Sequence, residues 1–96
     1  MKQVKVPKPQ WNYEYMVRSQ ADEAVFHRQC AALEENIPDL IKERLLQDVD
    51  GSDYQYYTLD GARVIVGNDC YLDGVYIRSD VNLLPYFQHQ QERKVA

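Results

Sequence analysis

The tripeptide Leu-Asp-Gly occurs at 59–61 and again at 72–74, and a run rich in β-branched residues follows each copy. Asp-Gly is favoured at the centre of a type I′ turn because both central positions need a positive φ, and this turn joins antiparallel strands with the correct twist. The repeat therefore predicts two β-hairpins, which constrains the second half of the chain to an antiparallel sheet.

A two-residue turn also fixes the register of each hairpin. At 60–61 it sets Leu59 opposite Ala62, and at 73–74 it sets Tyr71 opposite Tyr76. A three-residue loop at 67–69 is the connection that keeps the aliphatic side chains on one face. We therefore expect a four-stranded meander over residues 54–78. The alternative is that 70–72 belongs to a long loop that joins 62–66 to 75–79.

The first part of the chain predicts an arm and a fifth strand. Pro7 and Pro9 fix φ and remove amide donors, and three lysines lie among them, so residues 1–10 are expected to form an extended basic arm. Bulky side chains alternate with others over residues 11–17, which is typical of a β-strand.

The next segment has the apolar spacing of an amphipathic helix. Ser19 is followed by Asp22 three residues later, as at a capped N-terminus, and the helix is expected to continue to about residue 36. The predicted buried stripe consists of Phe26, Cys30, Leu33 and Ile37.

Two further helices are predicted. Pro38 suits the first turn of a helix that ends near Gly51, with an apolar stripe of Leu40, Ile41, Leu45 and Val49. A single kinked helix through Ile37 and Pro38 is the alternative. Ser79 or Asp80 can cap a short C-terminal helix. That helix would carry Leu83, Leu84 and Phe87.

These elements predict an α+β fold: an antiparallel β-meander of about four to five strands, two helices packed on one face and a short C-terminal helix. One domain is expected over residues 11–88, after the arm at 1–10 and before a polar tail at 89–96. A chain of this length supports a single modest core.

Charge and cysteine usage restrict the function classes. The chain has 11 basic and 15 acidic residues, and the three lysines of residues 1–9 leave 8 against 15, a net charge of −7 outside the arm. This charge disfavours general binding to nucleic-acid backbones. No apolar run reaches the length that crosses a membrane, and the two cysteines lie far apart. A cytoplasmic protein with reduced thiols is expected.

The meander register predicts a row of aromatic and arginine side chains on the face opposite the aliphatic one. Tyrosine outnumbers phenylalanine eight to two, and Tyr and Arg supply much of the binding energy in protein interfaces. The predicted partner-binding residues are Tyr54, Tyr56, Arg63, Ile65, Tyr71, Tyr76 and Arg78. The alternative is that another element covers this face, or that its tyrosine pairs only stabilise the sheet.

The leading hypothesis is a small acidic protein-binding module without catalysis, of the kind that serves as an inhibitor, immunity or regulatory protein of a phage or mobile element. It would occlude a protein partner with this face. A homodimer that buries two such faces is a rival. A different class is a single-stranded nucleic-acid binder that uses the basic arm and the Tyr/Arg face.

No enzyme, cofactor or metal site is predicted. The sequence lacks the motifs of nucleotide-binding loops, hydrolases and zinc proteases. The residues His27, Cys30, Cys70 and His89 complete a Cys2His2 inventory. Their spacing does not follow that of zinc sites, so buried thiols and solvated histidines are expected instead.

Overall fold

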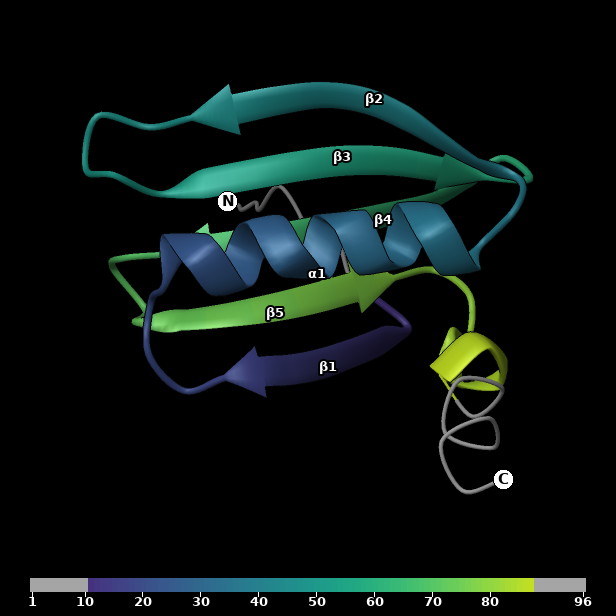
Figure 1. Cartoon of the computed structure of the whole chain (residues 1–96), viewed down its shortest axis with the longest axis horizontal. Helices are drawn as coiled ribbons and strands as arrows, with labels where there is room; N and C mark the ends of the chain where they lie inside the picture. Colours follow the sequence, from purple (N-terminus) through teal and green to yellow (C-terminus); the bar gives the residue numbers. More distant parts are fainter. Residues whose placement is uncertain (1–10, 88–96) are drawn as a thin grey trace, which may run out of the picture.

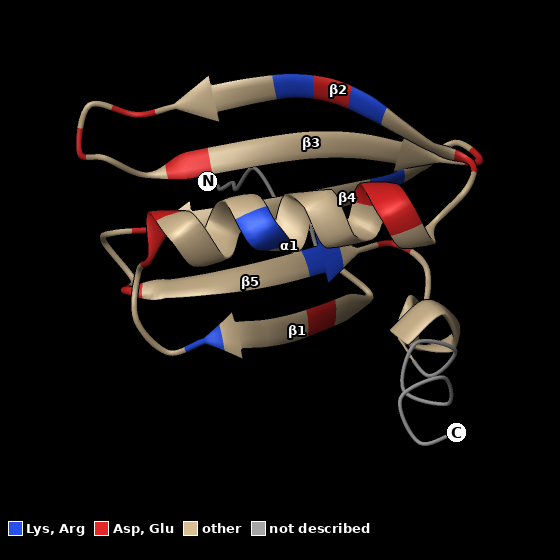
Figure 2. Cartoon of the chain, viewed as in Figure 1, with Lys and Arg blue, Asp and Glu red and all other residues tan. Residues whose placement is uncertain are grey.

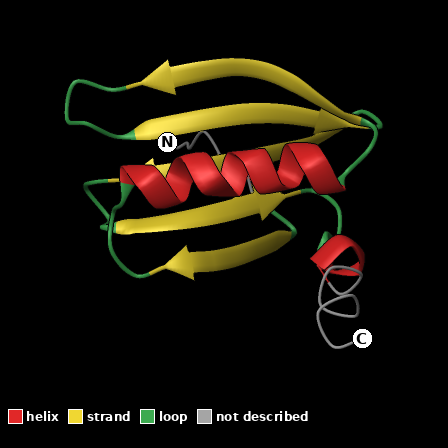
Figure 3. Ribbon diagram, viewed as in Figure 1, coloured by secondary structure: helices red, strands yellow, loops and turns green. Residues whose placement is uncertain are grey.

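One helix lies across a five-stranded antiparallel sheet in the computed structural model, which describes residues 11–87 (Figure 1). The strands are β1 (Tyr13–Arg18), β2 (Leu40–Gln47), β3 (Asp53–Leu59), β4 (Ala62–Asp69) and β5 (Gly74–Ser79), and the helix is α1 (Glu23–Asn36). The strand order is β1-β5-β4-β3-β2, so β2 to β5 form a meander and β1 adds beside β5. The predicted α+β class with an antiparallel sheet is confirmed (Figure 3). The predicted arm and tail lie outside the described residues.

The first predicted hairpin has the expected register. Leu59 pairs with Ala62, and Tyr57 pairs with Val64. Asp60 and Gly61 have φ values of 51° and 83°, the positive values that a type I′ turn needs at its two central positions. Asp-Gly therefore fixes which side chains of β3 and β4 share a face.

The predicted amphipathic helix is confirmed, and its cap is corrected. The N-cap is Asp22 instead of Ser19, because the Asp22 carboxylate accepts a hydrogen bond from the Val25 amide at 3.1 Å. All four predicted apolar residues, Phe26, Cys30, Leu33 and Ile37, are buried.

The predicted helix over 38–50 is wrong. Residues 40–47 form the edge strand β2, which pairs with β3. Between Lys42 and Leu45 the register shifts, so Glu43 and Arg44 together lie opposite the single residue Tyr56. This bulge moves the apolar residues on either side of it out of simple alternation. The same spacing suggests a helix when it is examined in the sequence alone.

The second predicted hairpin, with a two-residue turn at 73–74, is also wrong. Residues 67–69 belong to β4, and Asp69 pairs with Gly74 at the start of β5. Residues 70–73 form the loop between these strands, as the alternative anticipated. The strand ends because the Asp69 carboxylate accepts hydrogen bonds from the amides of Tyr71 and Leu72, each at 2.9 Å.

The predicted C-terminal helix is present as a helical turn over 84–87. Neither Ser79 nor Asp80 lies next to its start; the Leu84 amide there donates to the Asn82 side chain at 3.0 Å. Leu83 is fully buried, and its amide donates to the Tyr15 hydroxyl at 2.9 Å. The turn is thereby joined to β1.

The core lies between α1 and one face of the sheet. α1 contributes Phe26 and Leu33, and the sheet contributes inward-facing residues such as Val64, Val66 and Ile77, all at most 1% exposed. Burying large apolar side chains of this kind stabilises a fold by about 1.5–3 kcal/mol each. Within residues 11–87, no helix covers the opposite face of the sheet. Cys30 and Cys70 are free, as expected from the sequence, but only Cys30 is buried; the expected burial of Cys70 is wrong, because it lies in the exposed loop after β4.

No helix in the described part of the chain is both long enough and apolar enough to cross a bilayer.

Candidate functional site

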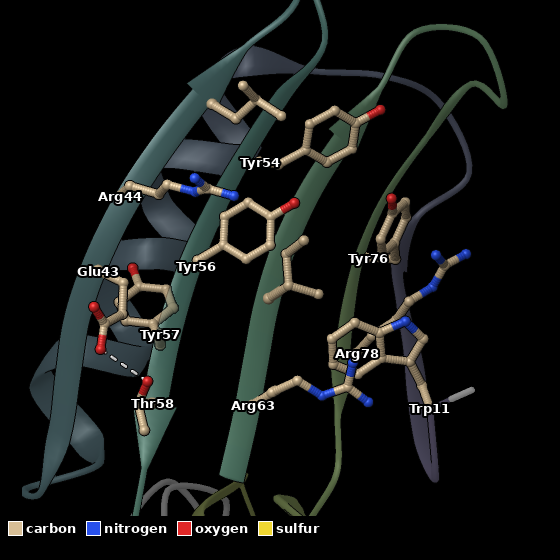
Figure 4. A pocket seen from close by; sticks show the side chains of 12 residues that line it. Trp11, Glu43, Arg44, Tyr54, Tyr56, Tyr57, Thr58, Arg63, Tyr76 and Arg78 are labelled. Atoms are coloured by element: carbon tan, nitrogen blue, oxygen red, sulfur yellow. Dashed lines mark hydrogen bonds between the residues drawn. The ribbon is translucent and has the colours of Figure 1, made fainter. Parts of the chain in front are cut away.

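A groove of about 580 Å³ occupies the face of the sheet opposite α1 (Figure 4). Strands β3, β4 and β5 form its floor. β2 forms one side through Glu43, Arg44 and Leu46, and Trp11, which precedes β1, lies at the other side. Alternate residues of a strand point to opposite faces, so most of the residues that line the groove are ones that do not enter the core under α1.

Three arginines of the groove stack on aromatic rings. The guanidinium carbons lie 4.2 Å from the ring centre for Arg63 over Trp11, 4.2 Å for Arg78 over Tyr76, and 5.3 Å for Arg44 over Tyr56. Each distance lies within the range of a cation–π interaction. The stacking holds flat side chains across the groove and reduces the rotamer freedom that binding would otherwise remove.

Two of these arginines are neutralised by acids. Arg63 binds both carboxylate oxygens of Asp80, from Nε at 2.8 Å and from Nη2 at 2.9 Å, and its backbone amide also donates to Asp80. These bonds lower the pKa of the Asp80 carboxyl. Arg78 donates from Nε to Glu14 at 2.7 Å.

Arg44 differs from the other two arginines. The neighbouring Glu43 carboxylate accepts a hydrogen bond from the Thr58 hydroxyl at 2.8 Å, and the two side chains point toward each other in Figure 4. Among residues 11–87, no carboxylate lies within ion-pair distance of the Arg44 guanidinium. Arg44 is therefore the cation of the groove that can accept an external anion.

The tyrosines of the floor are held in place. The Tyr54 hydroxyl donates to Asp69 at 3.1 Å, and burial raises the pKa of Tyr54 to about 12. Tyr76 is 5% exposed, and burial raises its pKa as well. Its ring lies over Gly67, where a Cβ atom would come within 2.5 Å of the ring. Glycine is needed at this position because the ring fills the space of a side chain.

The sequence prediction named six of the residues that line the groove: Tyr54, Tyr56, Arg63, Ile65, Tyr76 and Arg78. Its placement of Tyr71 is wrong. Tyr71 lies in the loop after β4, 89% exposed, and Ile65 pairs with Arg78 where Tyr71 was expected. The predicted row is corrected to Tyr56, Ile65, Arg78 and Glu14, taken across β3, β4, β5 and β1.

Six residues of the groove were missed: Trp11, Glu43, Arg44, Leu46, Tyr57 and Thr58. Three of them lie in β2, which the sequence pattern assigned to a helix. Trp11 was assigned only to a strand, and no sequence signal places its ring under the Arg63 guanidinium. Tertiary pairing of β1 with β5 brings the two together.

The groove is close to neutral overall. The positive charges of Arg44, Arg63 and Arg78 are matched in number by Glu14, Glu43 and Asp80 around it. Figure 2 shows acidic residues concentrated at the strand ends and loops as well. Such a surface gives little attraction to a polyanion, and it suits a partner that carries both apolar and charged groups.

The described members of the Cys2His2 inventory do not form a site. Cys30 is a buried residue of α1, Cys70 is exposed in the loop after β4, and His27 contacts Glu23 and Phe26 on the helix. Within residues 11–87, no three His, Cys, Asp or Glu side chains are close enough to hold a metal ion. Burial raises the pKa of the Cys30 thiol, which disfavours the reactive thiolate. His89 lies outside the described residues.

In comparisons with known proteins, no family model matches the chain, and no significant match is found to a curated protein or to a solved structure. The function is therefore inferred from the chemistry of the groove.

Proposed function

We propose that this protein is a non-catalytic binding module whose open sheet face docks a protein partner and occludes part of its surface. The observation that carries the proposal is the set of three stacked arginine–aromatic pairs across a groove of about 580 Å³. Rigid aromatic and arginine side chains provide large contact areas at a low entropy cost, and they dominate the binding energy of protein interfaces.

The charge of the groove supports a protein partner over a nucleic acid. Arg63 and Arg78 are occupied by Asp80 and Glu14, which leaves Arg44 as the guanidinium without an acidic partner among the described residues. A single available cation beside Tyr56 and Leu46 fits one carboxylate next to an apolar side chain. A protein segment offers this combination, and bidentate pairing with arginine would fix its orientation.

The biological role that we propose is the one predicted from the sequence. A small acidic chain that blocks another protein fits an inhibitor, immunity or regulatory role in a phage or mobile element, acting in the cytoplasm. The open face supports the binding step of this proposal.

The test is affinity capture followed by a measured dissociation constant. The immobilised chain is exposed to a cell lysate, the captured protein is purified, and its affinity is measured for the wild type and for a Trp11→Ala, Tyr56→Ala double variant. Removing two aromatic anchors is expected to raise the dissociation constant by about tenfold or more. Arg44→Gln should also weaken binding, because it removes the cation proposed for the partner's carboxylate.

A matched control lies on the exposed side of α1. His27 and Arg28 are exposed there, so a His27→Ala, Arg28→Ala variant changes the opposite side of the molecule and leaves the groove unaltered. Circular dichroism must show that both double variants are folded. Equal affinity of the groove variant and the control would contradict the proposal and would make the aromatic pairs purely structural.

A second candidate function is single-stranded nucleic-acid binding, which is favoured by the partly exposed rings of Trp11 and Tyr56 beside arginines. It predicts binding to a short single-stranded oligonucleotide with an affinity that falls steeply as the salt concentration rises. Replacing Lys2, Lys5 and Lys8 should lower this affinity further. Absence of binding at low salt would remove this candidate. Oligonucleotide binding, with no protein captured from the lysate, would overturn the first candidate function.

A further inference from the structure

β2 is an edge strand with an unusually exposed apolar surface. It ends the sheet beside β3, and residues 41–47 are all exposed. Ile41, Leu45 and Leu46 are 57%, 44% and 42% exposed. An edge of this kind presents free backbone groups and apolar side chains to any strand of suitable pattern.

The hairpin turn decides which backbone groups of β3 face β2. Leu59 and Ala62 close the two-residue turn and exchange hydrogen bonds, so the odd-numbered residues of β3 bond to β4 and the even-numbered ones to β2. The same alternation continues beyond the strand, where the Asp48 amide donates to the Ser52 carbonyl at 2.9 Å.

The outward groups of β2 follow from this alternation. Lys42 lies opposite Tyr57, and Leu45 lies opposite Gln55, so both stand opposite odd-numbered residues of β3. Their amides and carbonyls therefore point away from the sheet. Lys42 and Leu45 are the central pair of free backbone positions on the edge.

The bulge makes the middle of β2 unusual. Glu43 and Arg44 both project to the groove face, Glu43 toward Thr58 and Arg44 over Tyr56. An ordinary strand would place two successive side chains on opposite faces. The charged residues of β2 are the adjacent Lys42, Glu43 and Arg44, and Figure 2 shows uncharged residues on either side of them.

We propose that the protein is a homodimer in which β2 pairs antiparallel with β2 of a second copy, about a two-fold axis between Glu43 and Arg44. In this register Glu43 of each copy stands opposite Arg44 of the other. Ile41 stands opposite the second copy's Leu46 on the same face. Lys42 and the second copy's Leu45 exchange backbone hydrogen bonds through the free groups identified above.

The side chains of β2 favour this register over the two registers that are shifted by one residue. A shift in one direction places Arg44 against Arg44, and a shift in the other places Glu43 against Glu43, so each sets like charges opposite each other. Either shift also brings a groove-face side chain opposite a helix-face one. Only the register centred between Glu43 and Arg44 satisfies both the charges and the faces.

The proposed dimer leaves the floor of each groove open, and it places Glu43 of the second copy where this carboxylate competes with a partner's carboxylate for Arg44. A two-fold axis between antiparallel edge strands runs perpendicular to the sheet, so the two sheets join as one and both grooves lie on the same side. This arrangement differs from a homodimer that buries two tyrosine faces, and it would allow one assembly to bind two partner sites.

The experiment is a charge exchange followed by mass measurement. Glu43→Arg gives a copy with two adjacent positive charges, and Arg44→Glu gives one with two adjacent negative charges. Sedimentation is measured for the wild type, for each variant and for their equimolar mixture. The wild type is expected at twice its 11.3 kDa chain mass. Each variant alone should dissociate with a constant raised about tenfold or more, since two pairs of like charges then stand opposite each other.

The mixture decides the proposal. The two variants restore opposite charges across the axis and are expected to form a mixed dimer with affinity close to that of the wild type. A wild type that stays monomeric up to about 1 mM would overturn the proposal, as would a mixture no tighter than either variant alone. Both changes lie at exposed positions, and circular dichroism must show that each variant is folded. Independently, amide exchange at Lys42 and Leu45 should slow as protein concentration rises; exchange independent of concentration would also overturn it.

Discussion

The face of the sheet under α1 and the face that forms the groove are built from alternate residues of the same strands. In β4, Val64 and Val66 point to the helix, whereas Ile65 and Gly67 point to the groove. The first face is held by aliphatic packing, and the second by stacked rings and paired charges. The packing under the helix and the recognition proposed for the groove thereby depend largely on different residues of one short chain.

The largest expected effect comes from the face under α1. Phe26 is 1% exposed at the centre of the core, and Phe26→Ala should lower the free energy of unfolding by about 3–5 kcal/mol. Tyr56→Ala in the groove should cost about 1 kcal/mol or less, because this side chain remains partly exposed. Urea unfolding of both variants measures the difference. Equal losses would mean that the groove is part of the core.

A smaller effect is expected at the point where the groove is itself tightly packed. Gly67→Ala places a methyl group within 2.5 Å of the Tyr76 ring, so the ring must move, at a cost of about 1–3 kcal/mol. In a Tyr76→Ala background the same change should cost much less. Unfolding of the two single variants and the double variant tests this coupling. Additive losses would show that the ring does not depend on the glycine.

A further difference between the two faces should appear in the stability at alkaline pH. The Tyr57 hydroxyl donates to Glu34 at 2.7 Å beneath the helix, and burial raises the pKa of Tyr57. The stabilisation linked to this proton is complete below the unfolded value near pH 10 and is lost as pH rises above it. Tyrosinate absorbance and circular dichroism should therefore show Tyr57 ionising together with unfolding. In Tyr57→Phe, the alkaline loss of stability should be smaller. Ionisation of Tyr57 in the folded chain would contradict its burial.

The smallest effect is expected at the ion pair of the groove. Arg63 lowers the pKa of Asp80, so the pair stabilises the fold above the unfolded pKa of about 4, and this contribution falls as pH drops through that range. Melting temperatures of the wild type, Asp80→Asn, Arg63→Gln and the double variant measure the coupling. It should be present at neutral pH and weaken in acid. A coupling that does not change with pH would exclude the carboxylate as its source.

The elements that depend on local chemistry could be predicted from the sequence. Asp60 and Gly61 determine a turn by their own backbone preferences, and the register of β3 with β4 follows without knowledge of the rest of the fold. The spacing of Phe26, Cys30 and Leu33 likewise predicts α1, since a helix satisfies its backbone within its own segment.

β2 could not be predicted, because its residues have opposing local and tertiary preferences. Leu, Lys, Glu and Arg favour helices, and the bulge at 43–44 replaces the period of two with a spacing that resembles a helical stripe. Pairing with β3 outweighs these preferences. The groove was found only in part for the same reason, since Arg44 and Leu46 belong to this strand.

Tyr71 illustrates a different limit. Cys70, Tyr71 and Leu72 have suitable side chains for a strand, and the Asp73-Gly74 pair after them suggests a turn. The Asp69 carboxylate instead binds two amides of this segment, which ends β4 and turns Tyr71 into solvent. A hydrogen bond from a side chain to the backbone leaves no signature in the pattern of apolar residues.

The bulge of β2 is held by a single buried amide. Nε2 of Gln55 lies 3.0–3.1 Å from the carbonyl oxygens of Glu43, Arg44 and Tyr56. The amide thus holds the one extra residue of the bulge in place. The residues before and after the bulge therefore keep their apolar and polar side chains on the same faces of the sheet. Loss of one residue here during evolution would exchange the surface positions of everything from Leu45 to Gln47, and would change what this edge can recognise while the core kept its sequence.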